Sequence, residues 1–255
     1  MEIIILIISS FITSAISAVI GMGGGIILLG IMALIIPDGF LVIALHGVIQ
    51  LFSNTTRVFI FRKYLKGVLI KEFFFGALFG LSISVIIIMI LIYFFNVKTA
   101  NQIEIDILKP GIGLFIIWYL YLKPSKKIVR IGSFKKVGLI SGLFSIFVGA
   151  TGPLIAAFFL EKDLTKENII SNKAACQVIS HLGKIPIFIF LFDLNYLNEY
   201  RLLTPLIISV YLGTYFGKKI LSNIKESVFH ILFKIALTII AIKLLIENTL
   251  AVDLF

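Results

Sequence analysis

Two stretches of the chain carry polar and charged side chains at one shared spacing within otherwise apolar sequence. In each stretch the polar residues follow one another at steps of four, three, one and three positions. The first polar stripe comprises His46, Gln50, Ser53, Asn54 and Arg57, and the second comprises Lys173, Gln177, Ser180, His181 and Lys184. This spacing predicts that each stripe occupies one face of an α-helix. Because amides, hydroxyls and cationic groups donate hydrogen bonds, both faces suit a small anion.

Each stripe follows an apolar segment that is interrupted by glycine. The first break is GMGGG at residues 21–25, and the second is GATGP at residues 149–153. We predict that a helix restarts just after Gly25 and just after Pro153, because glycine and proline interrupt helices and proline suits a first helical turn. Each restart would present unpaired N–H groups and the positive end of a helix dipole. The alternative is that these small residues only allow helices to pack closely.

The candidate binding residues come from both breaks and both stripes. Those in the breaks are Gly21, Gly23, Gly24, Gly25, Gly149, Thr151, Gly152 and Pro153. Those in the stripes are Gln50, Ser53, Asn54, Arg57, Gln177, Ser180, His181 and Lys184. In this hypothesis the backbone N–H groups of the breaks hold the oxygens of an anion, while the stripes add hydrogen bonds and positive charge.

The acidic residues favour an anion rather than a cation as the ligand. All 13 Asp and Glu residues lie at or beyond the ends of the apolar segments, whereas a buried cation site needs carboxylates or a ring of carbonyls. The chain has one cysteine, Cys176, and lacks the spacing of a zinc site or of a catalytic serine motif. We therefore expect no metal, no cofactor and no enzymatic activity.

The elements that must position these residues are long and apolar. Hydrophobic residues make up 60% of the 255 residues and charged residues 14%, against about 45–50% and 25% in soluble domains. This composition excludes a soluble enzyme, a disordered chain and, despite a net charge of +10, a nucleic-acid-binding domain. A helix of about 20 apolar residues spans a bilayer. Apolar segments lie at 3–36, 43–61, 73–95, 107–122, 137–160, 168–192, 202–217 and 228–246.

These segments predict an all-α polytopic membrane protein built from two homologous halves. A shift of 128 residues aligns the two breaks, and a shift of 127 aligns the two stripes. A shift of 137 aligns Gly76 and Gly80 with Gly213 and Gly217. We expect a first repeat at 1–122, a basic cytoplasmic linker at 123–136 and a second repeat at 137–255. Paired broken segments in two halves point to the binding site of a transporter.

The distribution of Lys and Arg among the loops distinguishes two topologies. If all eight segments cross the membrane, 11 Lys and Arg residues lie in the loops of one side and 6 in those of the other. If the two broken segments are re-entrant hairpins, the division is 15 against 2. The positive-inside rule favours the second arrangement. Each half then crosses three times, so the halves are inverted, the basic loops are cytoplasmic and both termini lie outside. No basic stretch precedes the first segment, so we expect it to be retained rather than cleaved as a signal peptide.

A membrane location leaves other interpretations open for the charged members of the stripes. Arg57 and Lys184 lie toward helix ends, so each could snorkel to the membrane surface. Neutral polar residues at matching positions of the two stripes favour an inward-facing arrangement instead, because charge facing lipid is costly. His46 and His181 could titrate near physiological pH, or each could simply hydrogen-bond to a neighbouring helix.

Taken together, these motifs resemble those of the sulfite exporter TauE/SafE family, also called the toluene sulfonate uptake permease family. The resemblance rests on GMGGG, on GATGP and on the stretch from Lys173 through Gln177 and His181 to Lys184, and it covers nearly the whole chain. The chain departs from the family pattern in lacking a proline between Ile26 and Leu29. It also has Thr151 and Pro153 where glycines would complete a second GxGGG pattern.

The resemblance implies a function that the residues alone do not specify. The family moves sulfur-containing anions, such as sulfite, sulfoacetate and other organosulfonates, across bacterial inner membranes. We therefore expect a secondary transporter of the cytoplasmic membrane that exports a small sulfur oxyanion or organosulfonate. A passive anion channel and an uptake permease for the same substrates remain alternatives. The sequence assigns neither a coupling ion nor an oligomeric state.

Overall fold

A computed structural model of the chain describes most of its residues. The described residues are 1–20, 23–103, 108–122, 133–152, 155, 164–220, 234–235 and 237–246. Within them all regular structure is helical and no strand occurs. The predicted all-α class is therefore confirmed.

The helices follow the apolar segments closely. The first part of the chain forms α1 (Glu2–Ile20), α2 (Gly24–Ile35), α3 (Gly39–Ile60), the short helix η1 (Arg62–Tyr64), α4 (Gly67–Phe94), η2 (Ala100–Gln102), α5 (Leu108–Ile117) and η3 (Trp118–Leu122). The second part forms α6 (Phe134–Val148), α8 (Lys166–Leu191), α9 (Tyr200–Ile220) and a last helix over Leu237–Ile246. The first broken segment is thus split into two helices, as predicted.

The helices have the length and surface of membrane-embedded elements. Three of them are long and apolar enough to span a bilayer, at Gly39–Ile60, Gly67–Phe94 and Glu167–Leu191. Large apolar side chains also face outward, as Phe75 and Phe79 do on α4. Such an exposed apolar surface would be an aggregation hazard in water but suits lipid chains. The protein is a polytopic membrane protein.

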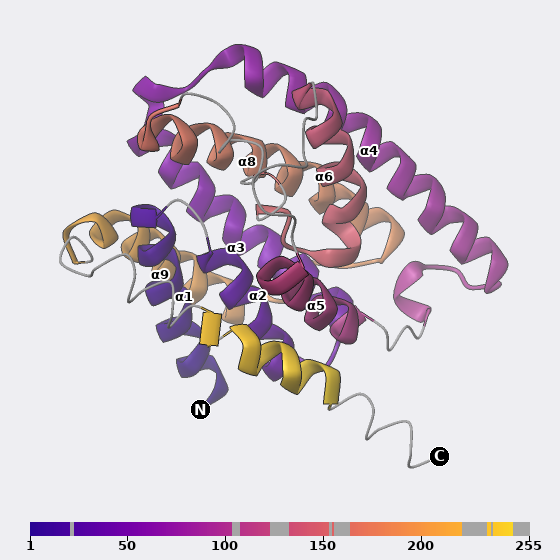
Figure 1. Cartoon of the computed structure of the whole chain (residues 1–255). Helices are drawn as coiled ribbons and strands as arrows, with labels where there is room; N and C mark the ends of the chain where they lie inside the picture. Colours follow the sequence, from indigo (N-terminus) through magenta and orange to yellow (C-terminus); the bar gives the residue numbers. More distant parts are fainter. Residues whose placement is uncertain are drawn as a thin grey trace.

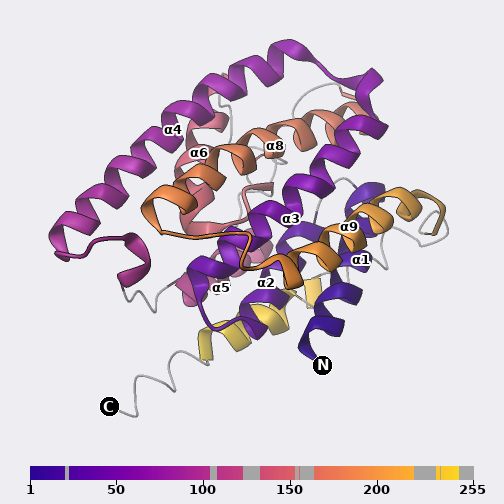
Figure 2. The same ribbon diagram turned by 180° about the vertical axis from the view of Figure 1, so that it is seen from behind.

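The two parts of the chain pack against each other in a reciprocal pattern (Figures 1 and 2). Helices α3 and α8 pack together in the middle, α4 lies against α6 and α8, and α9 lies against α1 and α3. If α1, α3 and α4 are exchanged with α6, α8 and α9, the α3–α8 contact maps onto itself and each of the other four maps onto another of the set.

Glycines allow the outer helix pairs to approach closely. A Cβ added at Gly76 or Gly80 of α4 would overlap backbone atoms of α6, and one added at Gly213 or Gly217 of α9 would overlap backbone atoms of α1. Small residues let membrane helices gain van der Waals contact in this way. These four glycines, which align at the shift of 137 residues, therefore allow α4 to pack closely on α6 and α9 to pack closely on α1.

We expect a Gly80→Ala substitution to destabilise the α4–α6 contact, because its methyl group would overlap the carbonyl oxygen of Leu139. Overpacking of this kind costs about 1–3 kcal/mol. The thermal unfolding midpoint in detergent should fall by several degrees. Gly67→Ala is the matched control, because no atom lies within 4 Å of the added Cβ. Equal midpoints for the two variants would contradict the packing role of Gly80.

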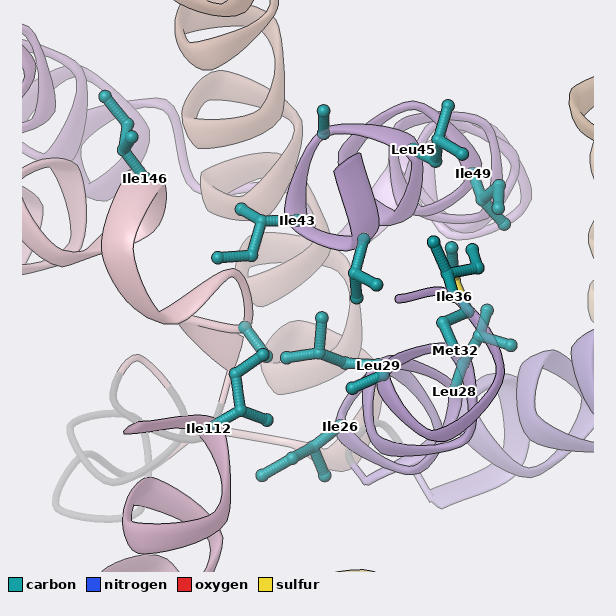
Figure 3. Close-up of a cluster of buried hydrophobic side chains, with 14 of the residues drawn as sticks. Ile26, Leu28, Leu29, Met32, Ile36, Ile43, Leu45, Ile49, Ile112 and Ile146 are labelled. Carbon is teal, nitrogen blue, oxygen red and sulfur yellow. The ribbon is translucent and has the colours of Figure 1, made fainter. Parts of the chain in front are cut away.

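Helix α2 is anchored in the main hydrophobic core, which fixes the position of the first break (Figure 3). Leu28, Leu29 and Met32 of α2 are fully buried. They belong to the same cluster as Ile43 of α3 and Ile112 of α5, and Figure 3 shows these side chains gathered around α2. Fully burying such a side chain stabilises a fold by about 1.5–3 kcal/mol relative to exposure in water, and in the membrane close packing takes over that role. The chain that follows the first break is therefore held inside the protein.

Candidate functional site

The first break separates α1 from α2. Gly23 precedes α2 and has a φ angle of 98°, which residues other than glycine rarely adopt. No side chain caps the helix. Ile27 N donates to Gly23 O at 3.2 Å, so α2 begins at Gly24. The predicted restart after Gly25 was therefore two residues too late. Gly21 lies outside the described residues.

Gly24 and Gly25 have different neighbours although they are adjacent. A Cβ added at Gly24 would overlap the carbonyl oxygen of Thr13, so α2 folds back closely onto α1 at this point. A Cβ added at Gly25 would instead lie 3.1 Å from Oε1 of Gln50 on α3. Gly24 thus serves packing, whereas Gly25 keeps the space in front of the first stripe open.

The second break also contains a glycine with a positive φ angle and a glycine that lies against a glutamine. Gly149 ends α6 with a φ angle of 79°. Ile155 N donates to Thr151 O at 3.1 Å, so a helical turn restarts directly after Thr151. A Cβ added at Gly152 would lie 2.7 Å from Nε2 of Gln177. Gly152 therefore faces the second stripe as Gly25 faces the first. The predicted restart after Pro153 was also too late. Pro153 itself lies outside the described residues.

Both stripes face the interior of the protein. All ten stripe residues have an exposed fraction of 7% or less. Arg57 is 2% exposed and Lys184 is 0% exposed, so neither reaches the membrane surface. The snorkelling alternative for these two residues is wrong, because α3 and α8 pack their polar faces into the protein.

The two breaks and the two stripes meet at a small cavity. Its volume is about 20 Å³, which is room for about one water molecule. The predicted binding residues that line it are Gly23, Gly25, Gln50, Arg57, Gly152 and Gln177. It is also lined by Ser17, Ile26, His46, Ala150 and Lys173. Residues far apart in the sequence, from both parts of the chain, thus share one buried polar space.

Two stripe residues hold the breaks in place. His46 Nε2 donates to Gly25 O at 2.8 Å, and Lys184 Nζ donates to Gly149 O at 3.2 Å. Gly149 ends α6, where the carbonyl groups carry the negative end of the helix dipole, so the cation is well placed there. His46 therefore makes a structural hydrogen bond to another helix, and Lys184 binds a break rather than lining the cavity.

The remaining predicted residues of the stripes, and Thr151, are not among the residues that line the cavity. Ser53 Oγ lies 3.2 Å from Thr214 Oγ1 on α9, Asn54 Nδ2 donates to Gln50 O, and Ser180 Oγ donates to Cys176 O. The Oγ1 atom of Thr151 and both ring nitrogens of His181 are buried without a hydrogen-bond partner. The His181 and His46 ring centroids are 6.2 Å apart.

Sequence reasoning missed Ser17 as a cavity residue. It lies on α1, is 3% exposed and lines the cavity. Ser10, Ser14 and Ser17 are spaced by four and three residues within an apolar helix. This spacing marks a polar face on α1 and would have identified the residue.

The charges near the cavity are positive. The buried polar side chains of the described residues include Arg57, Lys173 and Lys184 but no Asp or Glu. Arg57 Nε donates to Ser53 O of its own helix at 3.4 Å. Burying positive charge is costly, so an anion placed beside these cations would stabilise them further.

Comparison with known proteins agrees with these observations. The chain matches the sequence profile described as sulfite exporter TauE/SafE over residues 6–244. No curated protein and no solved structure gives a significant match. The profile covers both breaks, both stripes and nearly all of the helices described above. The chain therefore belongs to the sulfite exporter TauE/SafE family.

Proposed function

We propose that the protein is a secondary transporter that exports a small sulfur-containing anion, sulfite or an organosulfonate, across the bacterial cytoplasmic membrane. The observation that carries this proposal is the cavity shared by both breaks and both stripes. The buried cations beside it, together with the lack of a buried carboxylate among the described residues, fit an anionic substrate. Family membership supports the substrate class.

The lining groups suit an oxyanion. Arg57 supplies positive charge and several N–H donors, and the amides of Gln50 and Gln177 supply further donors from opposite parts of the chain. Gly25 and Gly152 have no side chain that would keep oxygens away from these amides. Charge-assisted hydrogen bonds of this kind are about twice as strong as neutral ones.

The start of α2 adds backbone donors to the same space. No side chain caps this helix, and Gly23 and Gly25 line the cavity. The first N–H groups of a helix lack partners within it and carry the positive end of its dipole. An anion at this point would accept hydrogen bonds from the first turn of α2, which the core holds in place.

The small volume of the cavity fits a closed state of an alternating-access cycle. A space for about one water molecule is too small for an ion with three oxygens. Substrate entry then requires the lining residues of the first part of the chain to move apart from those of the second part. We infer that the repeat at 1–122 and the repeat at 137–255 move against each other around the site.

The reciprocal packing of the helices supports two related repeats. The α4–α6 and α1–α9 contacts correspond under exchange of the halves, and so do the α3–α9 and α4–α8 contacts. Each break lies against a glutamine of its own half, Gly25 against Gln50 and Gly152 against Gln177. In this arrangement the site lies between the repeats, where relative motion opens and closes it.

Hydrogen bonds between α8 and η1 support re-entrant breaks over eight crossing segments. Asn168 Nδ2 and Asn172 Nδ2, at the start of α8, donate to Tyr64 O just beyond the end of α3, at 2.8 and 3.0 Å. The end of α3 and the start of α8 therefore lie at the same end of the bundle. Eight crossings would put them on opposite sides of the membrane. The basic loops are then cytoplasmic and the termini outside.

A ligand screen tests the proposed substrate class. Thermal unfolding of the purified protein is measured with sulfite, sulfate, thiosulfate, taurine and sulfoacetate. A ligand at about 100 times its dissociation constant stabilises the native state by about 2.7 kcal/mol, which is readily measured. We expect sulfite or an organosulfonate to raise the midpoint and to be released from loaded proteoliposomes. No stabilisation by any of these anions, with no efflux of them, would contradict the proposal.

The same proteoliposomes distinguish a carrier from the alternative of a passive anion channel. A carrier that alternates between two states gives saturable counterflow, which is accelerated by substrate on the opposite side. A channel gives large currents without such acceleration. The closed cavity favours the carrier.

We expect a His181→Gln substitution to flatten the pH dependence of transport. Both ring nitrogens of His181 are buried without a partner, and Lys184, His46 and Arg57 are the charged or titratable groups that act on it. A histidine that gains and loses a proton during the cycle would couple transport to pH, and glutamine cannot do so. His46→Gln is the control, because His46 already donates to Gly25 O. An unchanged pH profile in His181→Gln would remove His181 from the coupling.

A further inference from the structure

A groove with a basic and aromatic lining lies where the end of α3 meets α9. Its volume is about 660 Å³, and it shares no lining residue with the site cavity. The lining residues that matter here are Phe59, Ile60, Arg62, Lys63, Tyr211 and Tyr215. Residues 62–72, which include η1 and the start of α4, lie at the same end of the bundle and contain four Lys and Arg residues.

The end of the groove beyond α3 is positively charged. Arg62 and Lys63 lie on η1 and are both exposed, and none of the acidic residues that the structure describes lines the groove. The guanidinium carbon of Arg62 lies 5.0 Å from the centroid of the Phe59 ring, a cation–π contact that orients the side chain. This end therefore presents two neighbouring cations, one of them held in position.

The rest of the groove has an aromatic wall. Phe59 is 68% exposed, and Tyr211 and Tyr215, one turn apart on α9, are 52% and 58% exposed. The two tyrosine rings stack with centroids 6.4 Å apart. Tyrosine is enriched where membrane proteins meet the headgroup region of a bilayer, because its ring is apolar and its hydroxyl is polar.

We propose that this groove binds an anionic phospholipid. Its phosphate lies against Arg62 and Lys63, and an acyl chain runs along Phe59, Tyr211 and Tyr215. Basic pockets between membrane helices recognise acidic headgroups in this way. A free anion would use the two cations but leave the aromatic wall without a role, so the combination of charge and apolar surface favours a lipid.

The position of the groove links lipid binding to the helix that carries the first stripe. Tyr215 follows Thr214, whose Oγ1 lies 3.2 Å from Ser53 Oγ across the α3–α9 contact. A lipid seated between the end of α3 and α9 would contact both helices just beyond this hydrogen bond. Bound lipid should therefore stabilise the α3–α9 contact and raise the stability of the whole protein.

Lipid binding to the purified protein, measured in detergent, tests this proposal. Phosphatidylglycerol is titrated, with phosphatidylcholine and inorganic phosphate as separate arms, and thermal stability and native mass spectra are recorded. The variant R62Q/K63Q removes both cations of the groove. Its matched control is K71Q/K98Q, which removes the same charge at two exposed lysines outside the groove. Tyr215→Ala keeps both cations and shortens the aromatic wall.

We expect phosphatidylglycerol to bind the wild type and K71Q/K98Q equally, and R62Q/K63Q about tenfold more weakly, because charge-assisted hydrogen bonds are lost. Tyr215→Ala should also weaken phosphatidylglycerol binding. Equal binding by R62Q/K63Q and its control would overturn the proposal, and so would equally tight binding of phosphatidylcholine. If inorganic phosphate stabilises the protein as much as phosphatidylglycerol does, the two cations bind a free anion. That result would also overturn the proposal.

Discussion

A Gly25→Ala variant is expected to fold normally and to lose substrate affinity on the order of tenfold or more, because hydrogen bonds to the substrate are displaced. The added Cβ would lie 3.1 Å from Oε1 of Gln50, the free end of a flexible side chain that can move aside. The methyl group would then occupy a cavity of about 20 Å³ and shift one of its amide donors. Sulfite binding measured by thermal shift, with efflux from proteoliposomes, reports the loss.

The neighbouring glycine supplies the matched control. A Gly24→Ala methyl group would overlap the carbonyl oxygen of Thr13, so this variant is expected to unfold or to express poorly. Gly152→Ala should behave like Gly25→Ala, since its Cβ would meet only the side chain of Gln177. If Gly25→Ala and Gly152→Ala both fold and bind sulfite as the wild type does, the cavity is not the substrate site.

The different roles of Gly24 and Gly25 also show which features could be predicted from the sequence and which could not. Segment boundaries, the two breaks and the inward faces of α3 and α8 followed from hydropathy and helical spacing. These signals are local, because a helix repeats every 3.6 residues whatever its neighbours are. The separate roles of Gly24 and Gly25 depend instead on what packs against each, which is Thr13 in one case and Gln50 in the other.

The same limit applies to the stripes. Spacing placed Gln50, Arg57 and Lys184 on inward faces, and the structure confirms that they are buried. It did not predict that Lys184 would reach Gly149 O while Arg57 lines the cavity. A helical face gives direction around the axis, but which side chains reach a cavity depends on the tilt and packing of α3 against α8.

We expect an Arg57→Met substitution to raise the stability of the ligand-free protein and to abolish its stabilisation by sulfite. Arg57 is 2% exposed, and none of the described Asp or Glu residues is buried with it. An apolar side chain of similar length removes the cost of burying this charge, which is several kcal/mol per ion in proteins. The loss of a charged donor should weaken sulfite binding by roughly 10- to 100-fold.

The opposite signs of these two effects separate a binding role from a structural one. If Arg57 served mainly to hold α3 through its bond to Ser53 O, Arg57→Met would lower the unfolding midpoint without ligand. Arg57→Lys keeps the charge but not the fork of donors, so it should retain part of the sulfite response. Lys71→Gln is the control for charge loss at an exposed position. A sulfite-induced shift that survives in Arg57→Met would exclude this residue from the site, because a cation that binds the anion cannot be removed without weakening the response to that anion.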